Sequence, residues 1–394
     1  IRLGGTSPRS SGAATRPGLV GTWGMGTSQT ECCSICSRPA LPGSRSPGLG
    51  PGPRPSPLAP YILKNEHYEK QWTKIDSLAK KGLYKSALET VEIIFNDAKK
   101  NNNAPQFVKA VIHKMKFSSF IEEDALKKNL LELENETKEA QFPVKPALHS
   151  ILAQSYWSYY QQNRWVFMDR TETVDFVPEE ISTWDLKKIV EQVDFHYRKS
   201  LEDSERLKTL PIETFDAVLM EQRNARELRP TLYDFLAHRA IDFYMNEETG
   251  LTQPAYKFEI EGATYFSDAK TFSALSFSTP DSTSREYRAV LLLHDVIKFH
   301  LNDKNPEALI DANLKRLKFI YTHSVDEDKD SLVFSAFEKF EKEFISTPAS
   351  TEISYEIASM LSSQGGKYRN GDDNLRWKKK AAVDKCNEAI KRFP

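Results

Sequence analysis

The sequence has little cysteine, no long apolar run and almost no net charge. Its 394 residues include four cysteines, and Lys and Arg total 54 against 55 for Asp and Glu. The longest apolar run towards the C-terminal end is Ala289–Leu293, far short of the roughly 18 residues that a membrane-spanning helix needs. We therefore expect no transmembrane segment. The near-zero charge argues against a protein that coats nucleic acid, so we expect no nucleic-acid partner either.

Glycine and proline are scarce after about residue 60 and abundant before it. Residues 1–60 hold 11 of the 17 glycines and 10 of the 21 prolines, with six Arg, one Glu and neither Lys nor Asp. Such a composition buries too little apolar surface to offset the loss of chain entropy, so we expect a disordered head. Because the rest of the chain is Lys-rich, we interpret 1–60 as an unrelated or out-of-frame segment. We also interpret the chain as a fragment at both ends.

Three of the four cysteines, Cys32, Cys33 and Cys36, lie in this head. A zinc site needs a second pair of ligands, such as another C-x-x-C, and none follows, so we expect no metal there. The head also lacks the apolar core of a secretory signal, and its sequence indicates no localisation.

Apolar residues after Tyr61 recur at steps of three and four, which is the pattern of amphipathic helices. The segment Leu232–Met245 is apolar on most faces and predicts a helix buried between neighbours. Thr183 is a candidate N-cap for a helix that follows it. The most regular stripe lies at the end of the chain and comprises Ala382, Cys386, Ala389, Ile390 and Phe393.

One interval between helices has a different period. Tyr256, Phe258 and Ile260 alternate with charged residues between Pro254 and Gly262, and a period of two predicts a short extended segment or hairpin. We therefore divide the chain into the head at 1–60, a helical-repeat segment at 61–250, an irregular insertion at 251–283 with this extended piece at 254–262, and a second helical-repeat segment at 284–394.

The first predicted helix pair carries a repeat signal. Gly82, Tyr84 and Ala87 stand where a tetratricopeptide unit places its tight turn and the small residue at its helix crossing. Amphipathic pairs bury their apolar stripes by stacking on the next pair. The sequence therefore predicts an all-α fold, a degenerate tetratricopeptide-like solenoid of helix pairs.

The sequence offers no recognisable catalytic constellation. None of the eight histidines forms H-E-x-x-H, and the phosphate-binding and nucleophile-elbow glycine patterns are absent. Asp326–Asp330 begins like a calcium loop, but Ser331 replaces the required glycine and Phe337 the bidentate glutamate. Cys386 lies on an apolar stripe and is expected to be buried and protonated. We therefore expect no enzyme activity, no cofactor and no metal site.

A cluster of aromatic residues is the best candidate for a binding surface. It has two interpretations: the rings pack the core between helix pairs, or several of them line a concave groove that receives a peptide or a neighbouring domain. In the second case two arginines supply charge-assisted hydrogen bonds. The candidate surface comprises Tyr156, Tyr159, Tyr160, Arg164, Trp165 and Arg170.

Four segments carry a family resemblance: 159–165, 228–240, 253–258 and 305–311. With them, residues 61–394 resemble the N-terminal helical region of alpha-2-macroglobulin family proteins of Bacteroidetes-type bacteria. The resemblance implies a large exported protein of the periplasm or cell envelope whose later domains trap or inhibit proteases. The thioester motif of the family has no counterpart, because Cys386 is followed by Asn387 and Cys36 by Ser37.

Three functions follow from these observations. The first is a non-catalytic helical scaffold, part of a macroglobulin-like protease-trapping protein, that contacts its other domains or a protein partner. The alternative is a free-standing tetratricopeptide-like adaptor that binds peptides. The third is an all-helical hydrolase or lyase that uses Glu, His and Arg residues of 221–239.

Overall fold

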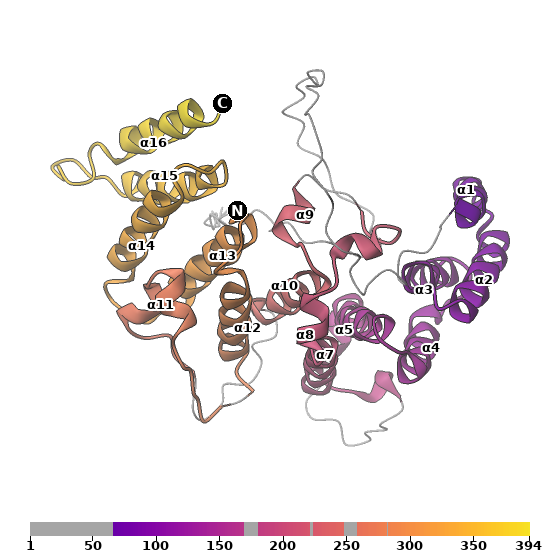
Figure 1. Ribbon diagram of the computed structural model, residues 1–394. Helices are drawn as coiled ribbons and strands as arrows, with labels where there is room; N and C mark the ends of the chain where they lie inside the picture. Colours follow the sequence, from indigo (N-terminus) through magenta and orange to yellow (C-terminus); the bar gives the residue numbers. More distant parts are fainter. Residues whose placement is uncertain (1–65, 169–179, 221–223, 248–257, 282) are drawn as a thin grey trace, which may run out of the picture.

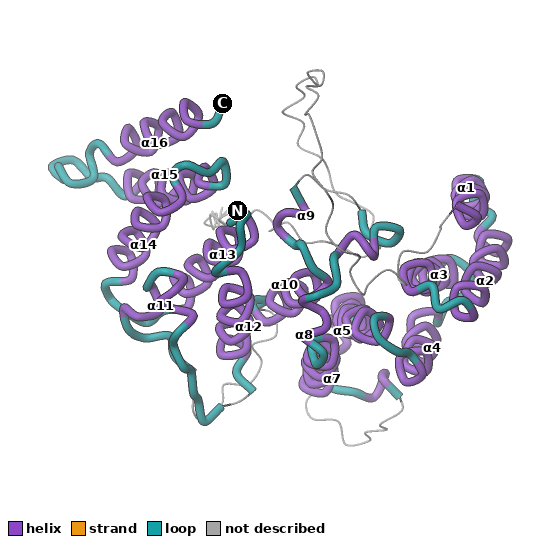
Figure 2. Tube along the Cα trace, in the orientation of Figure 1, coloured by secondary structure: helices purple, strands orange, loops and turns teal. Residues whose placement is uncertain are grey.

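The computed structural model describes residues 66–168, 180–220, 224–247, 258–281 and 283–394. The head at 1–60, its three cysteines, residues 254–257 of the expected extended piece and Arg170 lie outside the described residues. Within them the chain is all-helical and contains no strand, as the sequence predicts (Figure 2). None of the described helices is both long and apolar enough to cross a bilayer.

The first half of the array runs from α1 to α10. Its helices are α1 (Glu66–Lys80), α2 (Tyr84–Lys100), α3 (Ala104–Ser118), α4 (Ala125–Glu139), α5 (Val144–Gln162), α6 (Arg164–Met168), α7 (Leu186–Ser200), α8 (Ser204–Lys208), α9 (Ala225–Leu228) and α10 (Leu232–Tyr244), with short 3-10 turns at Ile181–Thr183 and Ile212–Phe215.

The second half continues from the insertion to α16. It contains a 3-10 turn at Ala263–Phe266, then α11 (Ala269–Ser273), α12 (Arg285–His300), α13 (Glu307–His323), α14 (Lys329–Phe344), α15 (Ser350–Gly366) and α16 (Lys378–Arg392).

Each long helix packs mainly on its neighbours in sequence. Contacts join α1 to α2, α2 to α3, α4 to α5, α5 to α7, and each helix from α12 to α16 to the next. The two halves are joined by α10, which packs on α5, α7 and α12. The helices therefore follow a curved path with α1 and α16 at opposite ends (Figure 1). This is a helical-repeat arrangement, in which each amphipathic helix is covered by the next.

Local sequence signals account for several of these elements. Gly82 adopts a φ of +73° in the turn between α1 and α2, a conformation that glycine reaches without steric cost. Ala87, three residues into α2, is fully buried at the crossing. The helix α10 is buried along nearly its whole length, which confirms the prediction made from its apolar faces.

Three local predictions are corrected by the structure. Thr183 belongs to a 3-10 turn, and Asp185 caps α7 instead by accepting a hydrogen bond from the Lys188 amide. Ile390 is 62% exposed and Cys386 is half-buried, although both belong to the apolar stripe of α16. The reason is that α16 lies mainly on α15, so only the side that carries Ala382 and Ala389 is covered.

The described part of the insertion forms no hairpin. Phe258 and Ile260 are buried and Glu259 and Glu261 are exposed, so the alternation is real. Ile260 makes a single parallel bridge to Ser324 at the end of α13. An extended segment thus docks on a helix end instead of pairing with a second strand.

Candidate functional site

The three tyrosines of the predicted binding surface lie in the core. Tyr156, Tyr159 and Tyr160 belong to α5 and are between 2% and 7% exposed. The Tyr156 ring stacks on Trp184 and on His196, each with centroids 5.6 Å apart, and its hydroxyl donates to Glu134. Burial, together with the Glu134 carboxylate, raises the pKa of Tyr156 far above its usual range.

Two members of the predicted surface reach solvent. Arg164 is exposed at the start of the short α6, and Trp165 beside it is 77% exposed. Arg170 lies outside the described residues. Among the described residues, the exposed part of the predicted surface is therefore limited to Arg164 and Trp165, while the three tyrosines are buried.

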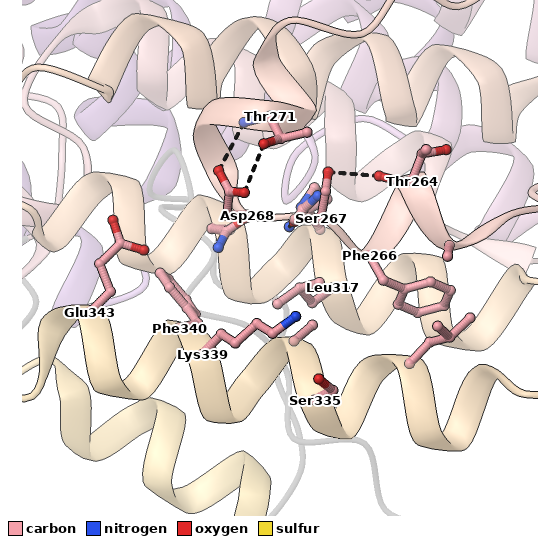
Figure 3. Close-up of a pocket in the computed structure, with 15 residues that line it drawn as sticks. Thr264, Phe266, Ser267, Asp268, Thr271, Leu317, Ser335, Lys339, Phe340 and Glu343 are labelled. Carbon is pink, nitrogen blue, oxygen red and sulfur yellow. Dashed lines mark hydrogen bonds between the residues drawn. The ribbon is translucent and has the colours of Figure 1, made fainter.

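A cavity that the sequence did not indicate lies between α13, α14 and the segment that leads into α11 (Figure 3). It has a volume of about 420 Å³, within the range of small-ligand pockets. Its lining is largely apolar. The lining residues are Ala263, Thr264, Phe266, Ser267, Asp268, Thr271, Asn313, Arg316, Leu317, Leu332, Ser335, Ala336, Lys339, Phe340 and Glu343.

Arg316 is a fully buried cation in the wall of this cavity. Its Nη1 donates to the Tyr265 carbonyl at 3.1 Å and its Nη2 to the Ser267 carbonyl at 2.7 Å. The guanidinium also lies 4.2 Å from the ring centroid of Phe272. Burial lowers the pKa of Arg316 to about 9, although the Asp268 carboxylate opposes this shift. Arg316 thus holds the turn before α11 against α13.

Two buried polar atoms of the same wall have no hydrogen-bond partner among the described residues. One is the Nε of Arg316, a donor, and the other is the Oδ1 of Asn313, an acceptor. Both residues are at most 1% exposed. A buried polar group without a partner costs roughly 1–3 kcal/mol, so such a pair is unusual in a folded protein.

The exposed rim of the cavity carries charges of both signs. Asp268 caps α11, and its carboxylate accepts from the Thr271 amide at 2.9 Å and the Thr271 hydroxyl at 2.7 Å. Burial and then the charge of Asp268 raise the pKa of Glu343. Figure 3 shows the Lys339 side chain extending away from Glu343, towards Leu317. No ion pair joins Lys339 to either carboxylate among the described residues.

The buried histidines connect helices. The Nδ1 atoms of His149 on α5 and His196 on α7 lie 2.9 Å apart, so one ring donates to the other. Burial, and then the nearby lysines, lower the pKa of His149 to about 4. Burial, and then the His149 charge, lower that of His196 to about 3. Both rings are therefore neutral at pH 7.

His238, the histidine of the proposed hydrolase site, is 5% exposed and lines neither the cavity beside Arg316 nor the smaller one beside His149. Burial lowers its pKa well below the usual value. In the described part of the chain no group of three or more His, Cys, Asp or Glu side chains is arranged to hold a metal ion.

The sequence does contain a signal for Asn313 and Arg316. Leu309, Asn313, Arg316 and Ile320 share one face of α13, so two polar residues occupy a stripe that is otherwise apolar and buried. Polar residues on such a stripe mark either an internal hydrogen-bond network or the wall of a site. The contact with the turn before α11 is set by tertiary packing and leaves no local pattern.

Comparison of this chain with protein-family models, with curated proteins and with solved structures finds no match.

Proposed function

We propose that this chain is a non-catalytic helical scaffold that holds other domains or a protein partner along its array. The observation that carries the proposal is the packing of consecutive helices along one curved path, which builds an extended surface from amphipathic helices. Its buried ionisable groups, such as His149 and His196, bond to side chains of neighbouring helices, as expected of groups that fix packing.

The family resemblance gives this scaffold a specific setting. It suggests that the chain is the N-terminal helical region of an alpha-2-macroglobulin-like protein that traps proteases. The coding sequence beyond Pro394 tests this setting, because β-sandwich domains must follow there. A stop codon, or a sequence without β-sandwich domains, would contradict it.

The cavity beside Arg316 favours a second candidate, a tetratricopeptide-like adaptor that binds peptides. It offers largely apolar walls, against which an apolar side chain of a peptide can pack. Both candidates are protein-interaction functions without catalysis.

Activity profiling of the full chain against ester, peptide and phosphoester substrates tests the absence of catalysis. We expect turnover at the level of the uncatalysed reactions. Turnover that disappears in His238→Ala but survives in His294→Ala would overturn the proposal and favour the hydrolase.

A further inference from the structure

The smaller cavity, beside His149, is polar and gathers charged side chains from three helices. It has a volume of about 240 Å³ and lies where the start of α5 meets the end of α7 and the short α8. The titratable residues that line it are Lys145, His149, Lys199, Glu202, Asp203 and Arg206. Three cations and two carboxylates therefore surround one imidazole ring.

His149 supplies a buried ring with a free bonding position. It is 8% exposed, and its Nδ1 lies 2.9 Å from the Nδ1 of His196. Its other nitrogen, Nε2, has no hydrogen-bond partner among the described residues and is not one of the unpartnered atoms that are closed off from solvent. Nε2 therefore keeps accessible surface in a ring that lines the cavity. The charges of Lys145, Lys199 and Glu202 all act on this ring, so these side chains lie around it.

The carboxylates do not neutralise the cations of the lining. Lys145 makes no ion pair with a carboxylate among the described residues. Lys199 donates to both oxygens of Glu202, at 2.8 and 3.0 Å, whereas Arg206 lies 3.7 Å from Asp203, beyond hydrogen-bond distance. Three cations less two carboxylates leave the lining with one excess positive charge, since the imidazole is neutral at pH 7.

The chemical group that matches these features is a phosphate. Its oxygens accept charge-assisted hydrogen bonds from several cations at once. The Arg206 guanidinium lies 3.8 Å from the ring centroid of Phe142, and stacking of this kind leaves its N–H edge available. When His196 donates to Nδ1 of His149, the proton of His149 is on Nε2, which can then donate to a phosphate oxygen.

We propose that the cavity beside His149 binds a phosphate group, held by Lys145, Lys199 and Arg206 and by a hydrogen bond from Nε2 of His149. This inference goes beyond the scaffold proposal and does not depend on it. The phosphate can be a free ion or part of a phosphorylated peptide, since both present the same group.

Other ligand classes match the cavity less well. A metal ion or an amine would be repelled by the three cations, and no group of three His, Cys, Asp or Glu side chains in the described part of the chain is arranged to hold a metal. A carboxylate offers two oxygens and one charge, so it engages fewer of the donors than a phosphate does. A neutral ligand leaves the excess positive charge without a counter-ion.

The first experiment measures binding to the full chain by isothermal titration calorimetry, at pH 7 and low ionic strength. The ligands are inorganic phosphate, acetyl-phosphoserine-amide and acetate. We expect both phosphates to bind, and acetate to bind at least about fivefold more weakly. Binding of the phosphoserine amide at least as tight as that of inorganic phosphate assigns the site to a phosphorylated peptide, and the reverse order assigns it to the free ion.

The second experiment locates the binding with matched variants that each remove one positive charge. Lys145→Gln and Arg206→Gln change the lining, whereas Lys187→Gln changes an exposed residue at the start of α7 that does not line the cavity. Lys187 is about 18 Å of helix away from Lys199. With melting curves that show all three variants folded, we expect phosphate to bind at least about fivefold more weakly to the first two and to change less than about twofold for the third.

The third experiment observes His149 without replacing it. Proton–nitrogen correlation spectra of the histidine rings are recorded as phosphate is added. The ring signals of His149 should move with the dissociation constant that calorimetry gives. Those of His294, which lies on α12 and contacts the Ser273 carbonyl, should stay in place.

Four results would overturn the inference: no binding of either phosphate, acetate binding as tight as phosphate binding, phosphate binding unchanged in both Lys145→Gln and Arg206→Gln, or His149 signals that stay in place while phosphate binds. None of them would touch the scaffold proposal. That proposal is tested separately, by the substrate profile and by partner contacts along the whole array.

Discussion

The Nε2 atom of His300 lies 2.8 Å from Oδ1 of Asp234, and both side chains are at most 1% exposed. His300 is the last residue of α12, and Asp234 belongs to the capping box that starts α10. The Nδ1 of His300 also lies 2.6 Å from Asp303. A buried charge-assisted contact thus fixes the end of one helix to the start of another, at the point where the two halves of the array meet.

This contact makes stability depend on pH. Burial opposes the charged ring, but the hydrogen bonds and charges of Asp234 and Asp303 outweigh it and raise the pKa of His300 above 6.5. The charged His300 ring therefore contributes its full stabilisation to the folded state below pH 6.5. This stabilisation is lost as the pH rises through the raised pKa. We expect the difference in unfolding free energy between wild type and His300→Gln to shrink over that interval, by at most about 1.4 kcal/mol per pH unit.

Urea denaturation from pH 5.5 to 9 measures this difference. The same comparison can be made with Asp303→Asn in the background, where the contact with Asp234 remains and one carboxylate charge is gone. There the pKa of His300 should be raised less, so the stability difference caused by His300→Gln should shrink at lower pH. A difference that grows with pH would contradict the assignment of a charged His300.

Two adjacent glycines at the end of α15 should respond in opposite directions to alanine. A Cβ at Gly365 would lie 2.8 Å from the backbone nitrogen of Lys379, whereas a Cβ at Gly366 meets nothing within 4 Å. Alanine favours a helix over glycine by about 1 kcal/mol, a gain that only Gly366 is free to realise. We expect Gly366→Ala to be neutral or stabilising by up to about 1 kcal/mol. Gly365→Ala should destabilise the protein and separate α16 from α15.

Hydrogen exchange of residues 378–392 distinguishes these effects. Protection there should fall in Gly365→Ala and remain in Gly366→Ala. Equal protection in the two variants would show that α15 and α16 are not packed as closely as described.

A buried carboxylate holds α16 to α14 and α15. Glu341 accepts from Lys385 at 2.5 Å, from Arg392 at 3.2 Å and from the Ser354 hydroxyl at 2.5 Å. Burial acts to raise the pKa of Glu341, but these contacts outweigh it and the pKa is lowered. We expect Glu341→Gln to cost roughly 1–3 kcal/mol, below the value for a fully buried pair because the two cations are partly exposed.

The control is Lys380→Gln, which removes an exposed ion pair with Asp384 on the same helix. Such a pair contributes roughly 0–1 kcal/mol. Chemical denaturation measures both variants. If Glu341→Gln lowers the free energy of unfolding by no more than Lys380→Gln does, Glu341 does not anchor α16.

The aromatic cluster should separate into structural and surface residues. Tyr160 is 3% exposed on α5, so Tyr160→Ala should cost about 3–5 kcal/mol through the cavity that it leaves. Trp165 is 77% exposed, so Trp165→Ala should change stability by less than about 0.5 kcal/mol. Thermal melts measure both. Similar losses of melting temperature would contradict the division.

The helices follow from sequence because each depends on its own period. The burial of α10, the turn at Gly82 and the alternation at 258–261 were all visible as local patterns. Thr183 and Ile390 were predicted wrongly for physical reasons. A 3-10 turn shifts the cap of α7 to Asp185, and the one-sided cover of α16 leaves part of its apolar stripe exposed.

The candidate site follows from contacts between distant segments. Arg316 bonds to carbonyls about 50 positions earlier in the chain, and His149 meets His196 from 47 positions away. No local period encodes such pairs. The polar interruptions at Asn313 and Arg316 were the available hint, and only the fold places them on a cavity wall.

The most direct test of the scaffold account is photo-crosslinking of the full protein in its native cells, from exposed positions along the array such as Trp165, Ile93 and Tyr355. The account predicts covalent adducts with another polypeptide, or with other domains of the same protein, from more than one helix. Adducts confined to the chain's own helices at all three positions would contradict it.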